Sequence, residues 1–85
     1  MYNEGMKQVK FYTKLNCSAC DTAYQMLVIV ALDIPLEIDI LDITHPHNGL
    51  EAAYAELIPV IAVTDLKQEL VWPFSLDDIK AYLSH

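Results

Sequence analysis

The stretch VKFYTKLNCSAC, residues 9–20, contains a strand, a loop and the first residues of a helix. Val9–Thr13 mixes β-branched and aromatic residues, which favours a strand, and we expect this strand in the centre of a sheet. From Ala19 to Ala31 the apolar residues recur every three or four positions, as they do on one face of a helix. The two cysteines of the chain, Cys17 and Cys20, therefore lie at the junction between a strand and a helix.

Further strands and helices are predicted along the rest of the chain. Alternating apolar and acidic residues predict an edge strand, and two later strands separated by a short turn predict a hairpin. Asn48 is expected to cap a short helix together with Glu51, and Ser75 forms a capping box with Asp78 before the last helix. The predicted strands are 36–42, 59–64 and 69–72, and the predicted helices are 50–57 and 76–83. The order β-α-β-α-β-β-α indicates an α/β fold that begins with a parallel βαβ unit and ends with an antiparallel hairpin.

The composition is typical of a small globular domain with an acidic surface. Eighty-five residues, 54% of them hydrophobic, are enough for a single domain over residues 1–85. Twelve acidic and five basic side chains give a net charge of −7, which excludes a nucleic-acid-binding role that needs clustered basic residues. We find no signal peptide, and no apolar run approaches the roughly 20 residues of a membrane span. We therefore expect a cytoplasmic protein, in a compartment that keeps thiols reduced.

The C-x-x-C spacing of Cys17 and Cys20 indicates thiol–disulfide chemistry. Cys17 is expected at the helix N-terminus, where free backbone N–H groups and the helix dipole lower a thiol pKa and favour the reactive thiolate. Cys20, one turn later, is positioned to resolve a mixed disulfide that Cys17 forms. The positive charge of Lys14 favours the nearby thiolate, and the negative charge of Asp21 disfavours it.

The cysteine pair has two other possible interpretations. A zinc site needs four ligands, and the other candidate ligands are His45 and His47, whose H-x-H spacing is unusual for zinc, so we expect no metal. Alternatively, the fold is kept and the activity is lost, which would leave a non-catalytic interaction module. The position of the pair beside a βαβ pattern favours redox chemistry over both interpretations.

The segment FYTKLNCSAC, residues 11–20, resembles the strand, lysine and C-x-x-C opening of glutaredoxins. The resemblance extends to LIPVIAV at 57–63, which is similar to the cis-proline segment of that family, and to SLDDIKAYL at 75–83. The ending VWPFSLDDI at 71–79 is most similar to a subgroup of small bacterial glutaredoxin-like proteins. The resemblance implies a thioredoxin-like fold, with a four-stranded mixed sheet and helices on both faces.

Applied to this sequence, the resemblance implies a role for each residue of the site. Cys17 is the nucleophile and Cys20 is the resolving thiol. Pro59 is the cis-proline that faces the pair, and the backbone of Ile58 aligns a substrate strand. Lys14 matches the lysine that lies near the thiolate.

The segment Trp72-Pro73-Phe74 departs from the family pattern, because glutaredoxins have two glycines and then an aspartate there to bind glutathione. Proline has no N–H to donate, so glutathione binding is in doubt, and no other cofactor is expected. Trp72 and Phe74 either line a substrate surface beside the disulfide or belong to the core. The expected partners are a disulfide-containing protein substrate and an upstream reductase or glutathione. The chain itself is expected to be a monomer, with no nucleic-acid or membrane partner.

Overall fold

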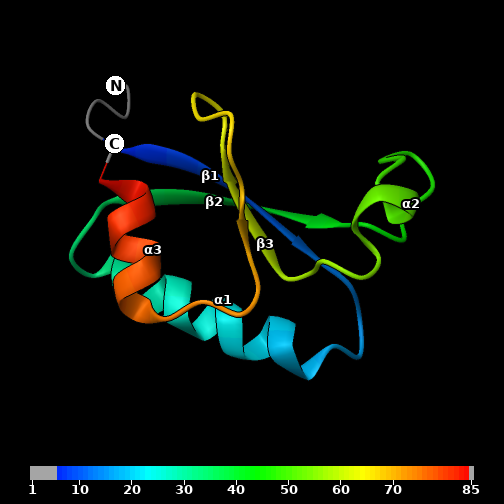
Figure 1. Ribbon diagram of the computed structural model, residues 1–85, viewed down its shortest axis with the longest axis horizontal. Coiled ribbons are helices and arrows are strands. Elements are labelled where there is room, and N and C mark those ends of the chain that lie inside the picture. Colours follow the sequence, from blue (N-terminus) through cyan, green and yellow to red (C-terminus); the bar gives the residue numbers. More distant parts are fainter. Residues whose placement is uncertain (1–5, 85) are drawn as a thin grey trace.

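The computed structural model describes residues 6–84, which form one mixed sheet and three helices (Figure 1). The elements follow in the predicted order β-α-β-α-β-β-α. Their bounds are β1 (Lys7–Thr13), α1 (Ser18–Ala31), β2 (Leu36–Asp42), α2 (Glu51–Tyr54), β3 (Val60–Val63), β4 (Leu70–Val71) and α3 (Leu76–Leu83). The predicted α/β fold is therefore confirmed.

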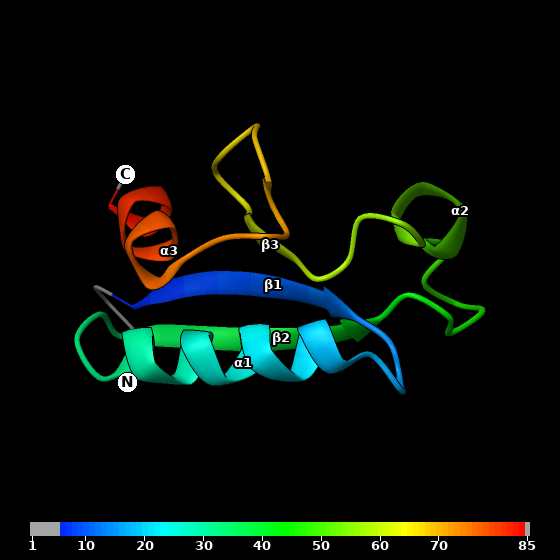
Figure 2. The ribbon, with the colours of Figure 1, turned by 60° about the horizontal axis from the view of Figure 1, so that its bottom comes forward.

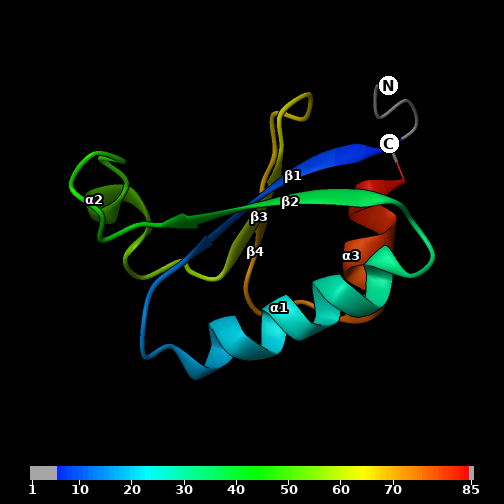
Figure 3. The same ribbon diagram turned by 180° about the vertical axis from the view of Figure 1, so that it is seen from behind.

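The strands lie in the order β2-β1-β3-β4, so β1 is central and β2 forms one edge, which Figure 3 shows from behind. β1 is parallel to β2 and antiparallel to β3, and β3 pairs antiparallel with β4. Tyr12 pairs with Val60, so the end of β1 lies beside the beginning of β3. This register brings the loop after β1 and the residue before β3 to the same end of the sheet.

Helices α1 and α3 cover one face of the sheet, and α2 covers part of the other. Because neighbouring residues of a strand point to opposite faces, alternate strand residues enter two separate clusters. The larger cluster joins β1 and β3 to α1 and α3 and includes Val9, Phe11, Ala23, Leu27, Val30, Ile61, Val63, Phe74, Ile79 and Leu83. The smaller cluster lies under α2 and includes Tyr12, Ile43, Val60 and Ala62. Figure 2 shows α2 at the opposite end of the strands from α3.

The predicted capping box at the start of α3 is confirmed. The Ser75 hydroxyl accepts the Asp78 N–H at 3.0 Å, and the Asp78 carboxylate accepts the Ser75 N–H at 2.8 Å. Later in the same helix, the Tyr82 hydroxyl accepts the N–H of Val63 at 3.1 Å and donates to the carbonyl of Gln68 at 2.7 Å. These bonds fix α3 against the β3–β4 hairpin.

The predicted cap of the short helix is wrong. The N-cap of α2 is Leu50, and no side chain bonds the free N–H groups there. The Asn48 side chain instead donates to the carbonyl of Asp42 at 2.7 Å, so it closes the loop after β2 rather than the helix. The helix is also shorter than predicted, because only Glu51–Tyr54 are helical.

The edge strand β2 is covered less than its alternating pattern suggests. Leu36 and Ile38 are half-buried, but Ile40 is 53% exposed. The alternation assigns Ile40 to the same face as the larger cluster, and the helices on that face leave it open to solvent. Within residues 6–84, no helix has the length and apolar character to span a membrane.

Candidate functional site

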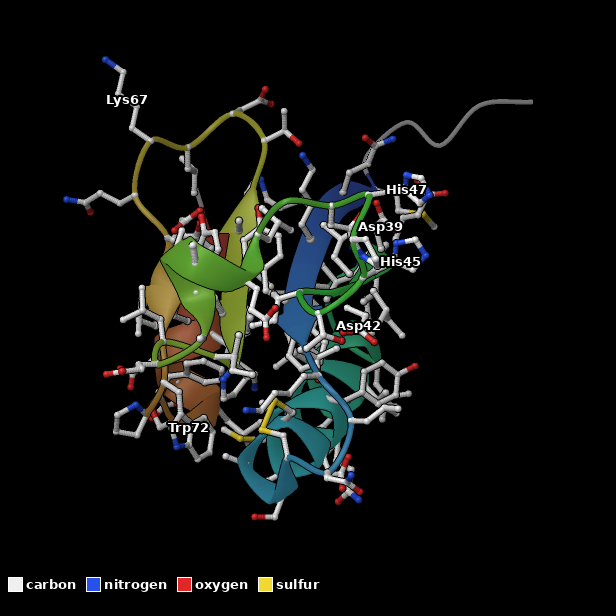
Figure 4. The ribbon with its side chains drawn as sticks, turned by 90° about the vertical axis from the view of Figure 1, so that its right-hand side faces the viewer. Asp39, Asp42, His45, His47, Lys67 and Trp72 are labelled. Carbon is white, nitrogen blue, oxygen red and sulfur yellow. A yellow bond between two sulfur atoms is a disulfide. The ribbon has the colours of Figure 1, made fainter. Side chains whose placement is uncertain are left out.

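Cys17 and Cys20 form a disulfide at the N-terminal end of α1. Their Cα atoms are 5.2 Å apart, one helical turn along the chain. Figure 4 looks at the end of the molecule where β1 ends and α1 begins, and it shows the disulfide at this end. Cys17 is partly exposed, whereas Cys20 is only 2% exposed. The two cysteine residues therefore differ in their exposure to solvent.

The backbone before α1 turns so that Cys17 caps the helix. Asn16 has a φ of 59°, the left-handed region that asparagine tolerates better than most residues. Cys17 follows in an extended conformation as the N-cap, and its sulfur accepts the Cys20 N–H at 3.2 Å. An N–H donor and the positive end of the helix dipole both favour negative charge on that sulfur when the pair is reduced.

The two charged residues predicted near the thiolate are both exposed. Lys14 lies in the loop between β1 and α1, and Asp21 lies in the first turn of α1. One positive and one negative side chain therefore flank the pair on the chain, and the roles predicted for both stay predictions.

Pro59 lies at the same end of the sheet as the disulfide. It directly precedes β3, where Val60 pairs with Tyr12 near the end of β1. Its side chain is buried, and the Ile58–Pro59 peptide bond is cis, which is the isomer that the resemblance implies. The N–H of Ile58 donates to the carbonyl of Tyr54 at 3.2 Å, so this group is already used within the chain. The substrate-aligning role of Ile58 and Pro59 stays a prediction.

The end of β4 brings Trp72 to the same end of the molecule. The Trp72 N–H donates to the carbonyl of Pro59 at 3.1 Å, and Figure 4 shows Trp72 on the β4 side of this end. The Trp72 ring packs edge-to-face on Phe74, with 5.1 Å between the ring centroids. Trp72 is partly exposed, but Phe74 is buried in the larger core cluster. Trp72 and Phe74 were the two aromatic residues considered for a substrate surface. Only Trp72 exposes part of its side chain there, and Phe74 is a core residue.

Three features of this end were not predicted. The Trp72–Pro73 peptide bond is cis, and an X-Pro sequence does not by itself select the isomer. Leu15, two residues before Cys17, is 80% exposed, and Leu57, two residues before Pro59, is 41% exposed. Sequence patterns assign apolar residues to the core by default, so exposed leucines in loops give no separate signal.

The histidines do not lie with the cysteines. His45 and His47 follow β2 in a loop, and their rings are 5.2 Å apart. In Figure 4 both lie well apart from the disulfide. In the part of the chain that the structure describes, no group of three or more His, Cys, Asp or Glu side chains is placed to hold a metal ion.

The chain is similar to a known protein family and to a solved structure. The sequence model of the Glutaredoxin-like domain (DUF836) matches residues 8–84. Among solved structures, the chain is similar to the X-ray structure of the Northeast Structural Genomics target protein XcR50 from X. campestris, with a TM-score of 0.71 and 27% sequence identity. The similarity covers 88% of this chain and 93% of that chain. No curated protein matches the sequence significantly.

Proposed function

Because this chain belongs to the glutaredoxin-like domain family, we propose that it is a thiol–disulfide oxidoreductase that reduces disulfide bonds in protein substrates. The observation that carries the proposal is the disulfide between Cys17 and Cys20 at the start of α1, with Cys17 partly exposed. A C-x-x-C pair at a strand-to-helix junction can exchange electrons with another disulfide through thiolate attack alone.

In the reduced protein, the Cys17 thiolate attacks one sulfur of the substrate disulfide and forms a mixed disulfide. The Cys20 N–H and the helix N-terminus stabilise that thiolate. Cys20 then attacks the sulfur of Cys17, which breaks the mixed disulfide and leaves the Cys17–Cys20 disulfide. Two electrons pass to the substrate, which leaves with two thiols, and an upstream reductase or glutathione later returns two electrons to the protein.

Features after β4 favour a protein substrate over glutathione. Pro73 has no N–H to donate to a peptide carboxylate, and the neighbouring Phe74 is buried in the core. One oxygen of the Asp78 carboxylate already accepts the Ser75 N–H within the capping box. Trp72 and Leu15 are the apolar side chains that would contact a protein surface around the disulfide.

A turnover assay tests this proposal. The protein would be supplied with a protein disulfide and, in separate reactions, with a thioredoxin reductase system or with glutathione and its reductase. We expect catalytic reduction with at least one of these reductants, and no activity from the Cys17→Ser variant, which lacks the attacking sulfur. Absence of turnover by the wild-type protein with both reductants would contradict the proposal and favour a non-catalytic interaction module.

A further inference from the structure

Under the proposed function, on which this inference rests, the thiol of Cys20 must lose its proton before its sulfur can attack Cys17. Cys20 is 2% exposed, so bulk water has little direct access to it. Among residues 6–84, the fully buried side chains include no polar or charged group. No buried base in this part of the chain can therefore take the proton.

An open pocket of about 360 Å³ reaches Cys20 between α1 and the edge of the sheet. Cys20 and Asp21 line it from α1, Thr13 lines it from β1, and Ile40 lines it from β2. The pocket lies on the β2 side of β1, whereas Pro59 and Trp72 belong to the β3–β4 side. It is therefore separate from the side on which we place the substrate. A pocket of this size holds several water molecules, since each takes about 30 Å³ in the liquid.

We propose that Cys20 releases its proton into this pocket and that the Asp21 carboxylate accepts it through water. The Cys20 sulfur then forms a bond with the Cys17 sulfur, the bond between Cys17 and the substrate breaks, and the substrate sulfur leaves as a thiolate. Asp21 passes the proton to solvent, because its side chain is exposed. Asp21 is thus a proton acceptor for the resolving step, distinct from the helix terminus that activates Cys17.

The other groups around Cys20 do not offer an equivalent acceptor. Phe11 and Thr13 from β1 and Ile40 from β2 carry no side chain that accepts a proton at neutral pH. On α1, Tyr24 and Gln25 also line the pocket, but a phenol and an amide accept a proton far less readily than the carboxylate of Asp21. Lys14, in the preceding loop, is a cation and cannot accept a proton.

The test is a rapid-mixing experiment on reduced protein with dithiobis-nitrobenzoate, a symmetrical chromogenic disulfide. One coloured thiolate leaves when Cys17 attacks, and a second leaves when Cys20 resolves the mixed disulfide, so each step has its own phase. In Asp21→Asn we expect the second phase to slow by about tenfold or more, because a positioned proton acceptor contributes about 10²–10⁴-fold to a rate. The first phase should not slow, because Cys17 keeps its helix terminus.

Whether the second phase slows or speeds up in Asp21→Asn distinguishes a proton acceptor from a residue that acts only by charge repulsion. If Asp21 acts only through its negative charge, its neutralisation favours the Cys20 thiolate and speeds the second phase. An unchanged or faster second phase would therefore overturn the proposal. The control is Asp65→Asn, an exposed carboxylate after β3 that changes the net charge equally and should leave both phases unchanged. A wild-type protein without a first phase would contradict the oxidoreductase function itself, which is a different result.

A second variant tests the pocket without changing the charge. Ile40→Trp adds a large ring at the mouth of the pocket and should slow the second phase severalfold by excluding water. Ile29→Trp is the matched control, because Ile29 is 48% exposed on α1, Ile40 is 53% exposed, and Ile29 does not line this pocket. Equal second-phase rates in the two variants would show that the proton does not leave by this route.

Discussion

Cys17 and Cys20 are three residues apart on the chain, but the helix gives them different surroundings. Cys17 caps α1 and is partly exposed, so under the proposed function it is the cysteine that an incoming disulfide meets. Cys20 has entered the first turn and faces the buried side of the helix with Ala23 and Leu27. A buried sulfur can reach the neighbouring Cys17 but not a large substrate. The exposure of Cys17 and the burial of Cys20 therefore support the proposed roles of Cys17 as the attacking thiol and Cys20 as the resolving thiol.

Replacement of the resolving thiol should trap the intermediate. In Cys20→Ser, Cys17 still attacks the substrate, but no second sulfur lies within reach to release it. We expect a stable mixed disulfide that a non-reducing gel or intact-protein mass spectrometry detects. Cys17→Ser is the control and should form no such adduct. Repeated turnover by Cys20→Ser would mean that Cys20 is not needed for release of the substrate.

The Tyr54 hydroxyl links α2 to the hairpin that contains β4. It donates to the Glu69 carboxylate at 2.6 Å, and its ring lies 4.5 Å from that of Tyr12, measured between centroids. We expect Tyr54→Phe to lower the free energy of unfolding by about 1 kcal/mol, since it removes the hydrogen bond and keeps the ring contact. Urea unfolding of both proteins at neutral pH measures this difference.

The hydrogen bond between Tyr54 and Glu69 should make the stability of the protein depend on pH. The hydrogen bond to Glu69, followed by desolvation and the negative charge of Glu69, raises the pKa of Tyr54 well above 10. A raised pKa in the folded state means that the stabilisation is fully present below about pH 10, the pKa of an unfolded tyrosine. It is lost as the pH rises through the folded pKa. The difference in the free energy of unfolding between wild type and Tyr54→Phe should therefore be constant from neutral pH to about pH 9 and shrink above pH 10.

Tyr24→Phe is the matched control for this prediction. The Tyr24 ring contacts Phe11 at 6.0 Å between centroids, and within residues 6–84 no hydrogen bond of its hydroxyl is found. Its replacement should change the stability by less than about 0.5 kcal/mol. Equal losses in the two variants would show that the Tyr54–Glu69 hydrogen bond contributes no measurable stability.

At the scale of whole elements, α3 depends on its N-terminal cap. Ser75→Ala removes the hydroxyl that accepts the Asp78 N–H and should lower the free energy of unfolding by about 1 kcal/mol. Ser84→Ala is the control at the other end of the helix, where the hydroxyl donates to the carbonyl of Lys80. Urea unfolding should show the larger loss for Ser75→Ala, because that hydroxyl satisfies an N–H group that has no partner inside the helix. A larger loss for Ser84→Ala would contradict this view of the cap.

Elements with a strong local signal were predictable from the sequence. The recurrence of Ala23, Leu27 and Val30 marks the buried face of α1, and these three residues are indeed buried. The short helix α2 lacked such a signal, because Glu51–Tyr54 contain a single turn and no buried residue. Asn48 can bond either a helix N–H or a nearby carbonyl, and the path of the loop after β2 selects the carbonyl of Asp42.

The candidate site was predictable where it rests on local spacing. The C-x-x-C spacing and the strand-to-helix junction put Cys17 and Cys20 at the start of α1. The pocket beside Cys20 was not predictable, because α1, β1 and β2 form it together. The burial of Phe74 also depends on how α3 packs on the sheet, which no local pattern contains.

At the scale of the whole molecule, the sheet has one well-covered face and one partly covered face. Residues from β1, β3, α1 and α3 meet in the larger cluster, while the cluster under α2 is smaller. Burial of apolar surface is the main stabilising contribution in a domain of this size. The packing of α1 and α3 on the sheet should therefore determine the stability of the fold more than α2 does.

Leu27→Ala tests how much the packing of α1 on the sheet contributes to stability. Leu27 is fully buried in the larger cluster, on the face of α1 that packs against the sheet. Removal of its side chain leaves a cavity and should lower the free energy of unfolding by about 2–5 kcal/mol in urea or thermal unfolding. Leu32→Ala is the control, since Leu32 directly follows α1 and is 81% exposed, and its loss should stay within about 0.5 kcal/mol. A loss for Leu27→Ala no greater than that for Leu32→Ala would mean that the packing of α1 on the sheet contributes little to stability.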